Sequence, residues 1–139
     1  MTARRRVWSG APWEGQAGYC RAVRVGAQIW VSGTAPVAAG GGVHAPGNAY
    51  AQARHCIDIL GEALRALDAD LSSVVRTRMF VTDIARWPDV VRAHREAFAD
   101  HPPATTMVEV KALIDPAMLV EIEADAVVDE PASAGSSRP

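Results

Sequence analysis

Apolar and polar residues follow one another along the chain in two patterns, one typical of helices and the other typical of strands. In one long segment the apolar residues recur at three- and four-residue spacing: Cys56, Ile57, Leu60, Ala63, Leu64 and Leu67. This spacing predicts a helix that begins at Asn48, a favourable N-cap residue, and ends near Asp68. Its apolar stripe is wide enough to cover one face of a sheet. Polar residues are expected largely on its other side: Gln52, Asp58, Glu62 and Arg65.

A second helix is expected from Pro88 to about Phe98, because proline favours the first turn of a helix. Six strands are expected around the two helices, at residues 5–8, 19–25, 28–32, 74–81, 105–110 and 119–128. Gly26 and Ala27 suit a tight hairpin between the second and third strands. One face of the fourth strand is expected to carry Val75, Thr77, Met79 and Val81.

The expected strands and helices do not alternate strictly, which argues against a doubly wound parallel sheet. We expect an α+β fold in which a mixed six-stranded sheet carries two helices on one face. The length suits a single domain, expected over residues 1–130. Residues 131–139 are rich in Pro, Ser, Ala and Gly and are expected to be disordered.

The last expected strand has two unlike faces. Its helix-facing side is expected to hold Val120, Ile122, Ala124, Ala126 and Val128. The opposite side mixes carboxylates with apolar residues: Leu119, Glu121, Glu123, Asp125 and Val127. Such a mixed face is typical of an interface or a pocket wall, but a solvated face paired with Arg76 and Arg78 explains it equally well. The pattern alone leaves both interpretations open.

Composition excludes several classes of partner. Apolar residues make up 49% and charged residues 22%, and the net charge of −2 gives no electrostatic footprint for nucleic acid or an anionic membrane. No apolar run approaches the about 18 residues of a membrane span, and the N-terminus lacks the pattern of a signal peptide. A cytoplasmic protein is therefore expected. The cysteines and histidines show no ligand spacing, and nucleotide-binding motifs are absent, so neither a metal nor another cofactor is expected.

Three stretches of the chain carry a family pattern when taken together. The first is Tyr19 followed by residues 31–36 (VSGTAP), and the second is residues 76–83 (RTRMFVTD). The third is residues 103–110 (PATTMVEV), with Leu113 and residues 120–124 (VEIEA) after it. In this order and spacing the chain resembles the RidA (YjgF/YER057c/UK114) family, from about Gly18 to Val128.

The resemblance implies a fold, an assembly and an activity. The family fold is a chorismate-mutase-like six-stranded mixed sheet with two helices on one face. Three such domains form a homotrimer whose small-molecule pockets lie between subunits. The best-understood members hydrolyse 2-imino or enamine acids to 2-keto acids and ammonia, without a cofactor. The resemblance therefore implies a small-molecule ligand and self-association as the partners.

Family site residues carry over to some positions of this chain. Glu121 matches the glutamate associated with the attacking water, and Tyr19 and Ser32 match residues that line the pocket. Met107 stands where a cysteine is common, and Thr105 stands where the family places the arginine that grips the substrate carboxylate. Independently of the family, Trp87 precedes the second helix, where it would either stack on a planar ligand or anchor packing.

Thr105 is the largest departure from the family pattern. A guanidinium binds a carboxylate through two charge-assisted hydrogen bonds, and such ionic bonds contribute roughly 1.5–3 kcal/mol. Threonine offers one neutral hydroxyl, so another residue would have to take the role, with Arg24, Arg76 and Arg78 as candidates from another strand or subunit.

The sequence therefore predicts an altered member of the family. We expect a hydrolase, deaminase or lyase-type enzyme acting on an imine, enamine or related metabolite in a specialised pathway. Ordinary 2-imino acids are not the expected substrates. The alternative is a trimer that binds a metabolite without converting it. Ribonuclease activity, attributed to parts of the family, is disfavoured because no basic groove or paired histidines are visible.

Overall fold

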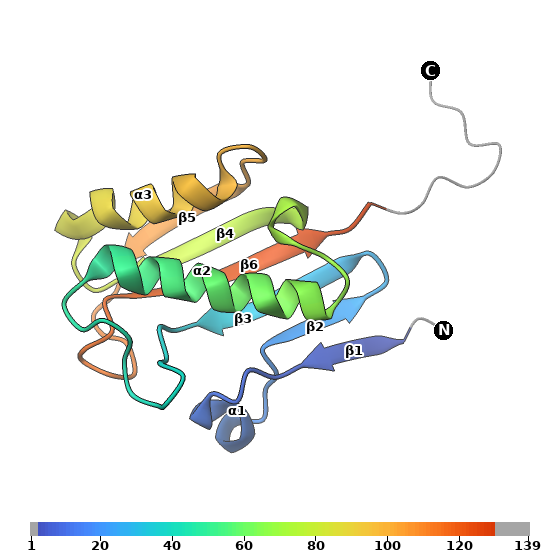
Figure 1. Ribbon diagram of the computed structural model, residues 1–139, viewed down its shortest axis with the longest axis horizontal. Helices are drawn as coiled ribbons and strands as arrows, with labels where there is room; N and C mark the ends of the chain where they lie inside the picture. The colour runs from blue at the N-terminus through green and yellow to red at the C-terminus, as the bar shows by residue number, and fades with distance from the viewer. Residues whose placement is uncertain (1–2, 130–139) are drawn as a thin grey trace.

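The computed structural model describes residues 3–129. In chain order the strands are β1 (Arg4–Val7), β2 (Ala22–Val25), β3 (Gln28–Thr34), β4 (Val74–Val81), β5 (Ala104–Glu109) and β6 (Val120–Val127). The helices are α1 (Pro12–Ala17), α2 (Ala49–Ala66) and α3 (Trp87–Phe98), with two short 3-10 helices, η1 (Leu71–Ser73) and η2 (Ile84–Arg86). Figure 1 shows all the strands joined in one sheet.

The sheet is mixed and six-stranded, in the order β1-β2-β3-β6-β4-β5, as predicted. Strands β4 and β5 are parallel, and the other neighbouring pairs are antiparallel. The last strand, β6, therefore lies in the middle of the sheet, between β3 and β4. This position places Glu121 on a central strand of the sheet rather than on an edge strand.

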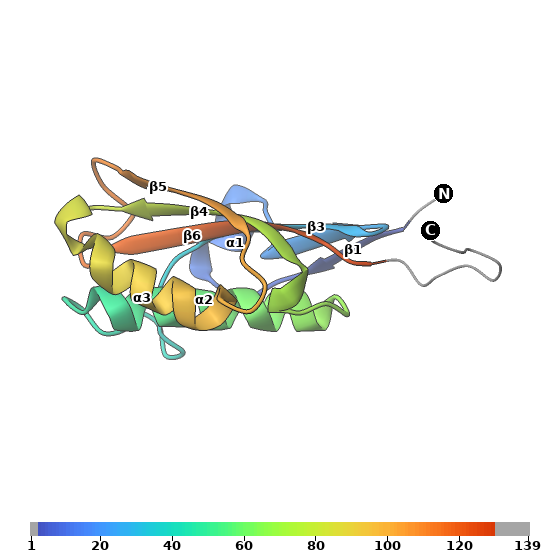
Figure 2. The same ribbon diagram turned by 90° about the horizontal axis from the view of Figure 1, so that it is seen from above.

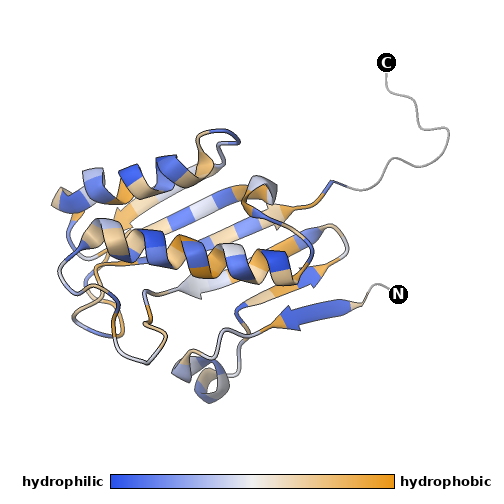
Figure 3. Ribbon diagram, viewed as in Figure 1, coloured by the Kyte–Doolittle hydropathy of each residue, from blue (hydrophilic) through white to orange (hydrophobic). Residues whose placement is uncertain are grey.

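Helices α2 and α3 cover one face of the sheet, as predicted (Figure 2). Asn48 caps α2, with its side-chain oxygen accepting a hydrogen bond from the Ala51 amide at 2.9 Å. Every residue of the predicted apolar stripe of α2 is buried. Apolar and polar positions alternate visibly along this helix (Figure 3). Each fully buried side chain of the size of Leu60 or Ile122 contributes roughly 1.5–3 kcal/mol.

Three sequence-based predictions about local structure were wrong. No helix was predicted between the first two strands, but Pro12 begins the short helix α1 there and Gly18, with φ of 77°, ends it. Gln52 is fully buried, and its amide group bonds the chain at Ala117 and Leu119. Val75 is 47% exposed, because a register shift between β4 and β6 at this end turns its side chain away from the helices.

A second irregularity in the sheet shapes the candidate site. The pairing of β3 with β6 shifts register between Val31 and Thr34. Ser32 and Gly33 lie inside this irregular stretch, next to Glu121 of β6. The expected disorder of residues 131–139 concerns a segment outside the described residues. Within residues 3–129, no helix has the length and apolar character needed to cross a membrane.

Candidate functional site

A cavity of about 240 Å³ lies beside the irregular stretch of β3. One part of its lining is polar and holds Tyr19, Arg21, Thr34 and Glu121. The rest is largely apolar, with Trp13 from α1, Ile59 from α2, and Val37 and Ile114 from loops. An apolar cavity with a few convergent polar groups is the usual form of a small-molecule site.

Glu121 contributes a titratable carboxyl group to the lining of this cavity. It is partly buried, and burial raises its pKa above the ordinary range, with a further increase from the neighbouring Glu123 and an opposing decrease from Arg21. Within residues 3–129 the Glu121 carboxylate has no hydrogen-bond or ion-pair partner. The predicted pairing of this face with Arg78 holds for Glu123 and Asp125, at 3.2 and 3.3 Å, and not for Glu121.

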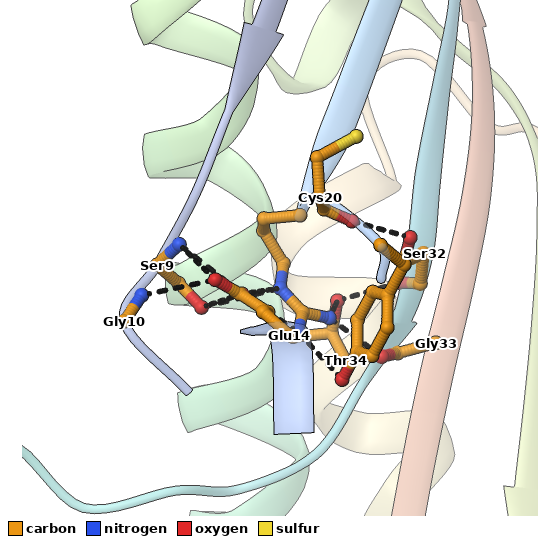
Figure 4. A network of polar contacts seen from close by, with 9 residues as sticks. Ser9, Gly10, Glu14, Cys20, Ser32, Gly33 and Thr34 are labelled. Atoms are coloured by element: carbon orange, nitrogen blue, oxygen red, sulfur yellow. Dashed lines mark hydrogen bonds and ion pairs between the residues drawn. The ribbon is translucent and has the colours of Figure 1, made fainter. Parts of the chain in front are cut away.

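A buried ion pair joins Glu14 to Arg21, and Arg21 lines the cavity together with Glu121. Figure 4 shows the polar contacts around Glu14. Both side chains are about 97% removed from solvent, with side-chain exposures of 3% and 4%. Two nitrogens of the Arg21 guanidinium contact the same carboxylate oxygen: Nη2 lies 3.0 Å and Nε lies 3.1 Å from Glu14 Oε2. Such a pair is held in place by charge-assisted hydrogen bonds.

The rest of the guanidinium is also occupied. Arg21 Nη1 donates to the Gly33 carbonyl at 2.6 Å and to Thr34 Oγ1 at 3.3 Å. Arg21 Nη2 approaches the Tyr19 hydroxyl at 3.5 Å, and the guanidinium carbon lies 5.4 Å from the centre of the tyrosine ring. Because these contacts engage every nitrogen of the group, Arg21 is not free to take the carboxylate of a ligand.

The Glu14 carboxylate also fixes the chain that leads into α1. Burial alone would raise the pKa of Glu14, but hydrogen bonds from Ser9, Arg21 and Gly10 outweigh it and lower the pKa. The Ser9 amide and hydroxyl donate at 3.1 and 2.5 Å, and the Gly10 amide donates at 3.2 Å. Figure 4 shows Ser9 and Gly10 converging on Glu14. Ser9 lines both this cavity and a second one of about 580 Å³ beside α2.

The structure brings together two of the six predicted site residues. Tyr19 and Glu121 line the same cavity. Ser32 lies close by, but its hydroxyl donates to the Cys20 carbonyl at 2.8 Å and it does not line the cavity (Figure 4). Trp87 is 52% exposed at the start of α3, and Thr105 and Met107 lie on the edge strand β5.

Thr105 takes part in a short chain of hydrogen bonds on β5 and β4. Its hydroxyl lies 2.7 Å from Thr77 Oγ1, which in turn lies 2.8 Å from His94 Nε2 on α3. Burial lowers the pKa of His94, so the ring is held neutral. The Thr105 side chain is therefore oriented by neighbours in its own subunit.

None of the three arginines considered as replacements lines the cavity. Arg24 donates to the carbonyls of Gly26 and Leu67 at 2.8 and 2.6 Å, and Arg78 is held by its two carboxylates. Arg21 is the arginine at the site, and the sequence-based reasoning missed both it and Glu14. One signal was present: Arg21 follows Tyr19 by two residues, and side chains two apart on an extended chain share a face.

No cluster of three or more potential metal ligands occurs in the part of the chain that the structure describes. The chemistry that the cavity offers is that of one carboxyl group with a raised pKa, a phenol and a neutralised guanidinium. This set suits proton transfer to and from a bound molecule or water. It offers no free cation for a charged ligand.

Comparisons with known proteins identify the family. The model of the family described as endoribonuclease L-PSP matches residues 11–128. Rv2704 from Mycobacterium tuberculosis, described as a YjgF/YER057c/UK114 member, superposes with a TM-score of 0.82 at 44% identity, covering 91% of this chain and 100% of that chain. An uncharacterised Streptomyces coelicolor protein is 36% identical over 88% of this chain and 90% of its own. The rat 2-iminobutanoate/2-iminopropanoate deaminase is 33% identical over 78% of this chain and 79% of its own. The chain thus belongs to the YjgF/YER057c/UK114 (RidA) family, as its sequence indicates.

Proposed function

We propose that this protein hydrolyses the C=N bond of an imine, or of an enamine through its imine tautomer, at Glu121. The preferred substrate carries no carboxylate next to the reacting carbon and is not an ordinary 2-imino acid. The observation that carries the proposal is the Glu121 carboxylate, partly buried and unpaired among the described residues, at the polar end of an otherwise apolar cavity.

Glu121 has the properties of a general base in this reaction. A raised pKa brings a carboxyl group closer to working pH, where it exchanges protons most efficiently. Glu121 takes a proton from water while the water oxygen bonds to the imine carbon, and the proton passes to nitrogen, which gives a carbinolamine. A second proton then moves from the new hydroxyl through Glu121 to nitrogen. The C–N bond breaks, and the products are a carbonyl compound and an amine or ammonia.

The other residues of the cavity favour a neutral substrate. The Arg21 charge is compensated by Glu14, so a substrate carboxylate would meet the Glu121 charge without a free cation to offset it. Trp13, Ile59 and Ile114 offer an apolar surface to the body of the substrate. Two relatives are named as imine or enamine deaminases, the rat protein and 3-aminoacrylate deaminase RutC of Acinetobacter baylyi, which supports C=N chemistry as the reaction class.

The activity test uses imines made in place by an amine oxidase from simple primary amines. Semicarbazide captures whatever imine escapes hydrolysis, so enzyme activity appears as a loss of semicarbazone. We expect activity in the wild type, its loss in Glu121→Gln, and its retention in Asp125→Asn, a carboxylate on the same strand and face but outside the cavity. Equal rates in wild type and Glu121→Gln would rule out the proposed chemistry.

Self-association into a homotrimer with pockets between subunits is part of the proposal. Large apolar side chains remain exposed on the sheet, with Trp30 at 43% and Val127 at 43%, and the edge strand β5 is exposed on most of its length. Exposed apolar patches of this kind typically mark protein interfaces. Light scattering at micromolar concentration should give the mass of three chains, and the mass of one chain would remove the basis for pockets between subunits.

A protein that binds a metabolite without converting it is the second candidate. The observation in its favour is the full occupation of Arg21, which leaves the Tyr19 hydroxyl and Glu121 as the polar groups open to a ligand. Binding of a neutral imine analogue by wild type and Glu121→Gln alike, with no turnover by either, would support this candidate against hydrolysis.

A further inference from the structure

Arg21 acts on two carboxylates, on Glu14 through direct contacts and on Glu121 through its charge. Glu14 holds Nε and Nη2 of Arg21, whereas Nη1 is directed to the Gly33 carbonyl and Thr34. No hydrogen bond joins Arg21 to Glu121 in the described residues, although both groups line the same cavity. Arg21 therefore forms hydrogen bonds with Glu14, whereas it acts on Glu121 only through its charge.

Arg21 leaves Glu121 without an ion pair because Glu14 is present to bind the guanidinium. A buried guanidinium without a partner carries a large desolvation cost and turns to the nearest available carboxylate. With Glu14 absent, that carboxylate is Glu121, which lines the cavity together with Arg21. An ion pair between Arg21 and Glu121 would make Glu121 a weaker base and would turn it away from bound water.

We propose that Glu14 is a positioning residue for the Glu121 site: by binding Arg21, it keeps the Glu121 carboxylate unpaired and able to accept a proton. This inference rests on the proposed function, in which Glu121 is the base. Glu14 itself does not line the cavity and touches no substrate. It acts through Arg21 and through its bonds to Ser9 and Gly10, which hold α1 and its Trp13 side chain in the cavity wall.

Several charged or titratable groups act on Glu121. Arg21 and Tyr19 line the same cavity from the segment before β2, and Arg21 favours the ionised form of Glu121. Glu123 lies two residues along β6 and favours the protonated form, although Arg78 from β4 neutralises part of its charge. The buried Cys56 thiol of α2 couples to Glu121 but stays protonated, since burial raises the pKa of this thiol. Burial remains the largest influence on the pKa of Glu121, and Arg21 is the cation among these groups that opposes it.

The test measures the Glu121 carboxyl titration directly, by carbon NMR of glutamate labelled at the carboxyl carbon. The Glu121 signal is assigned by its absence from Glu121→Gln. In Glu14→Gln, where the Arg21 charge is uncompensated, the Glu121 midpoint should fall below the wild-type value. In the double variant Glu14→Gln, Arg21→Gln, both charges are gone, and the midpoint should rise above the wild-type value. The control Glu96→Gln removes a carboxylate from an exposed pair with Arg54 and should leave the midpoint unchanged.

Opposite shifts in the single and double variants are the signature of positioning through Arg21. A purely structural role for Glu14 predicts a loss of stability with the Glu121 midpoint unmoved, and this result would overturn the inference. The double variant leaves no unpaired buried charge, so it keeps the test open where the single variant does not fold. A midpoint at or below the wild-type value in the double variant also overturns the inference.

The titration needs no substrate, so it separates this inference from the proposed function. Where imine hydrolysis is measurable, the acid limb of its pH profile should move in the same direction as the NMR midpoint in each variant. Opposite midpoint shifts together with full activity in Glu121→Gln would keep the positioning role and reject Glu121 as the base. Loss of activity in Glu121→Gln with unmoved midpoints would keep Glu121 as the base and reject the positioning role of Glu14.

Discussion

The Glu121 carboxylate packs directly against the main chain of Gly33. A Cβ at position 33 would lie 2.7 Å from Glu121 Oε2, closer than real Cβ contacts come, and 3.2 Å from its carboxyl carbon. Gly33 does not adopt a left-handed conformation, so the requirement for glycine here is steric and not a matter of backbone strain. The missing side chain of Gly33 makes the space in which the carboxylate lies.

Gly33→Ala should therefore displace Glu121 with little effect on stability, because the group that must move is the end of a flexible side chain. We expect a change of less than about 1 kcal/mol in the free energy of unfolding, together with loss of imine hydrolysis. Urea unfolding and the semicarbazone assay measure the two quantities. Gly40→Ala, at a loop glycine whose Cβ would meet no atom within 4 Å, is the matched control and should keep full activity.

Breaking the buried pair should be costly. Glu14→Gln leaves the Arg21 charge unpaired in the interior and should lower the free energy of unfolding by about 3–5 kcal/mol. Glu96→Gln, which removes the carboxylate of an exposed pair, should leave the urea midpoint unchanged. Equal effects of the two substitutions would show that the Glu14–Arg21 pair is solvated.

The stability of the wild type relative to Glu121→Gln should depend on pH in one direction. Burial raises the pKa of Glu121 above its ordinary value of 4.5, so the folded protein keeps this proton to a higher pH than the unfolded chain does. The stabilisation from proton binding is complete below pH 4.5 and is lost as the pH rises through the raised pKa. The variant cannot ionise, so it should gain stability relative to wild type between pH 4.5 and neutrality. Urea unfolding of both proteins from pH 4 to pH 8 checks this, and a wild type that gains stability relative to Glu121→Gln as the pH rises would contradict it.

Thr77 should matter more to stability than its exposed neighbour on β5. Its fully buried hydroxyl joins His94 to Thr105, so Thr77→Val leaves the His94 nitrogen without its partner and should cost about 1–3 kcal/mol. Thr106→Val changes an exposed side chain and should stay within about 0.5 kcal/mol of the wild type. Thermal or urea unfolding of the two variants provides the comparison.

The fold was predictable because its signals are local and repeated. In the stripe from Cys56 to Leu67 and in the alternation from Val120 to Ala126, several apolar residues each predict the same buried face. The burial of both sets was confirmed. Single residues were less predictable. Gln52 looked like a surface residue because nothing in its own segment shows that its amide meets the chain near Leu119, which is 67 residues away.

The candidate site was predictable only in part, for the same reason. The resemblance and the mixed face of β6 pointed to Glu121 and Tyr19, which do line one cavity. Glu14 and Arg21 come from a short helix and from the segment just before β2, and their pairing depends on tertiary contacts that no periodicity records. Thr105 and Met107 remain predictions, since their proposed role requires a neighbouring subunit.

The most direct test of this account compares two imines that differ only in a carboxylate. An amino-acid oxidase makes the 2-imino acid of leucine, and an amine oxidase makes the matching imine of isoamylamine, which has the same side chain without the carboxylate. We predict that the wild type hydrolyses the isoamylamine imine faster than the leucine imine, and that Glu121→Gln hydrolyses neither. Faster hydrolysis of the leucine imine by the wild type, abolished in Glu121→Gln, would contradict this prediction and show that the chain binds carboxylates without the arginine that Thr105 replaces.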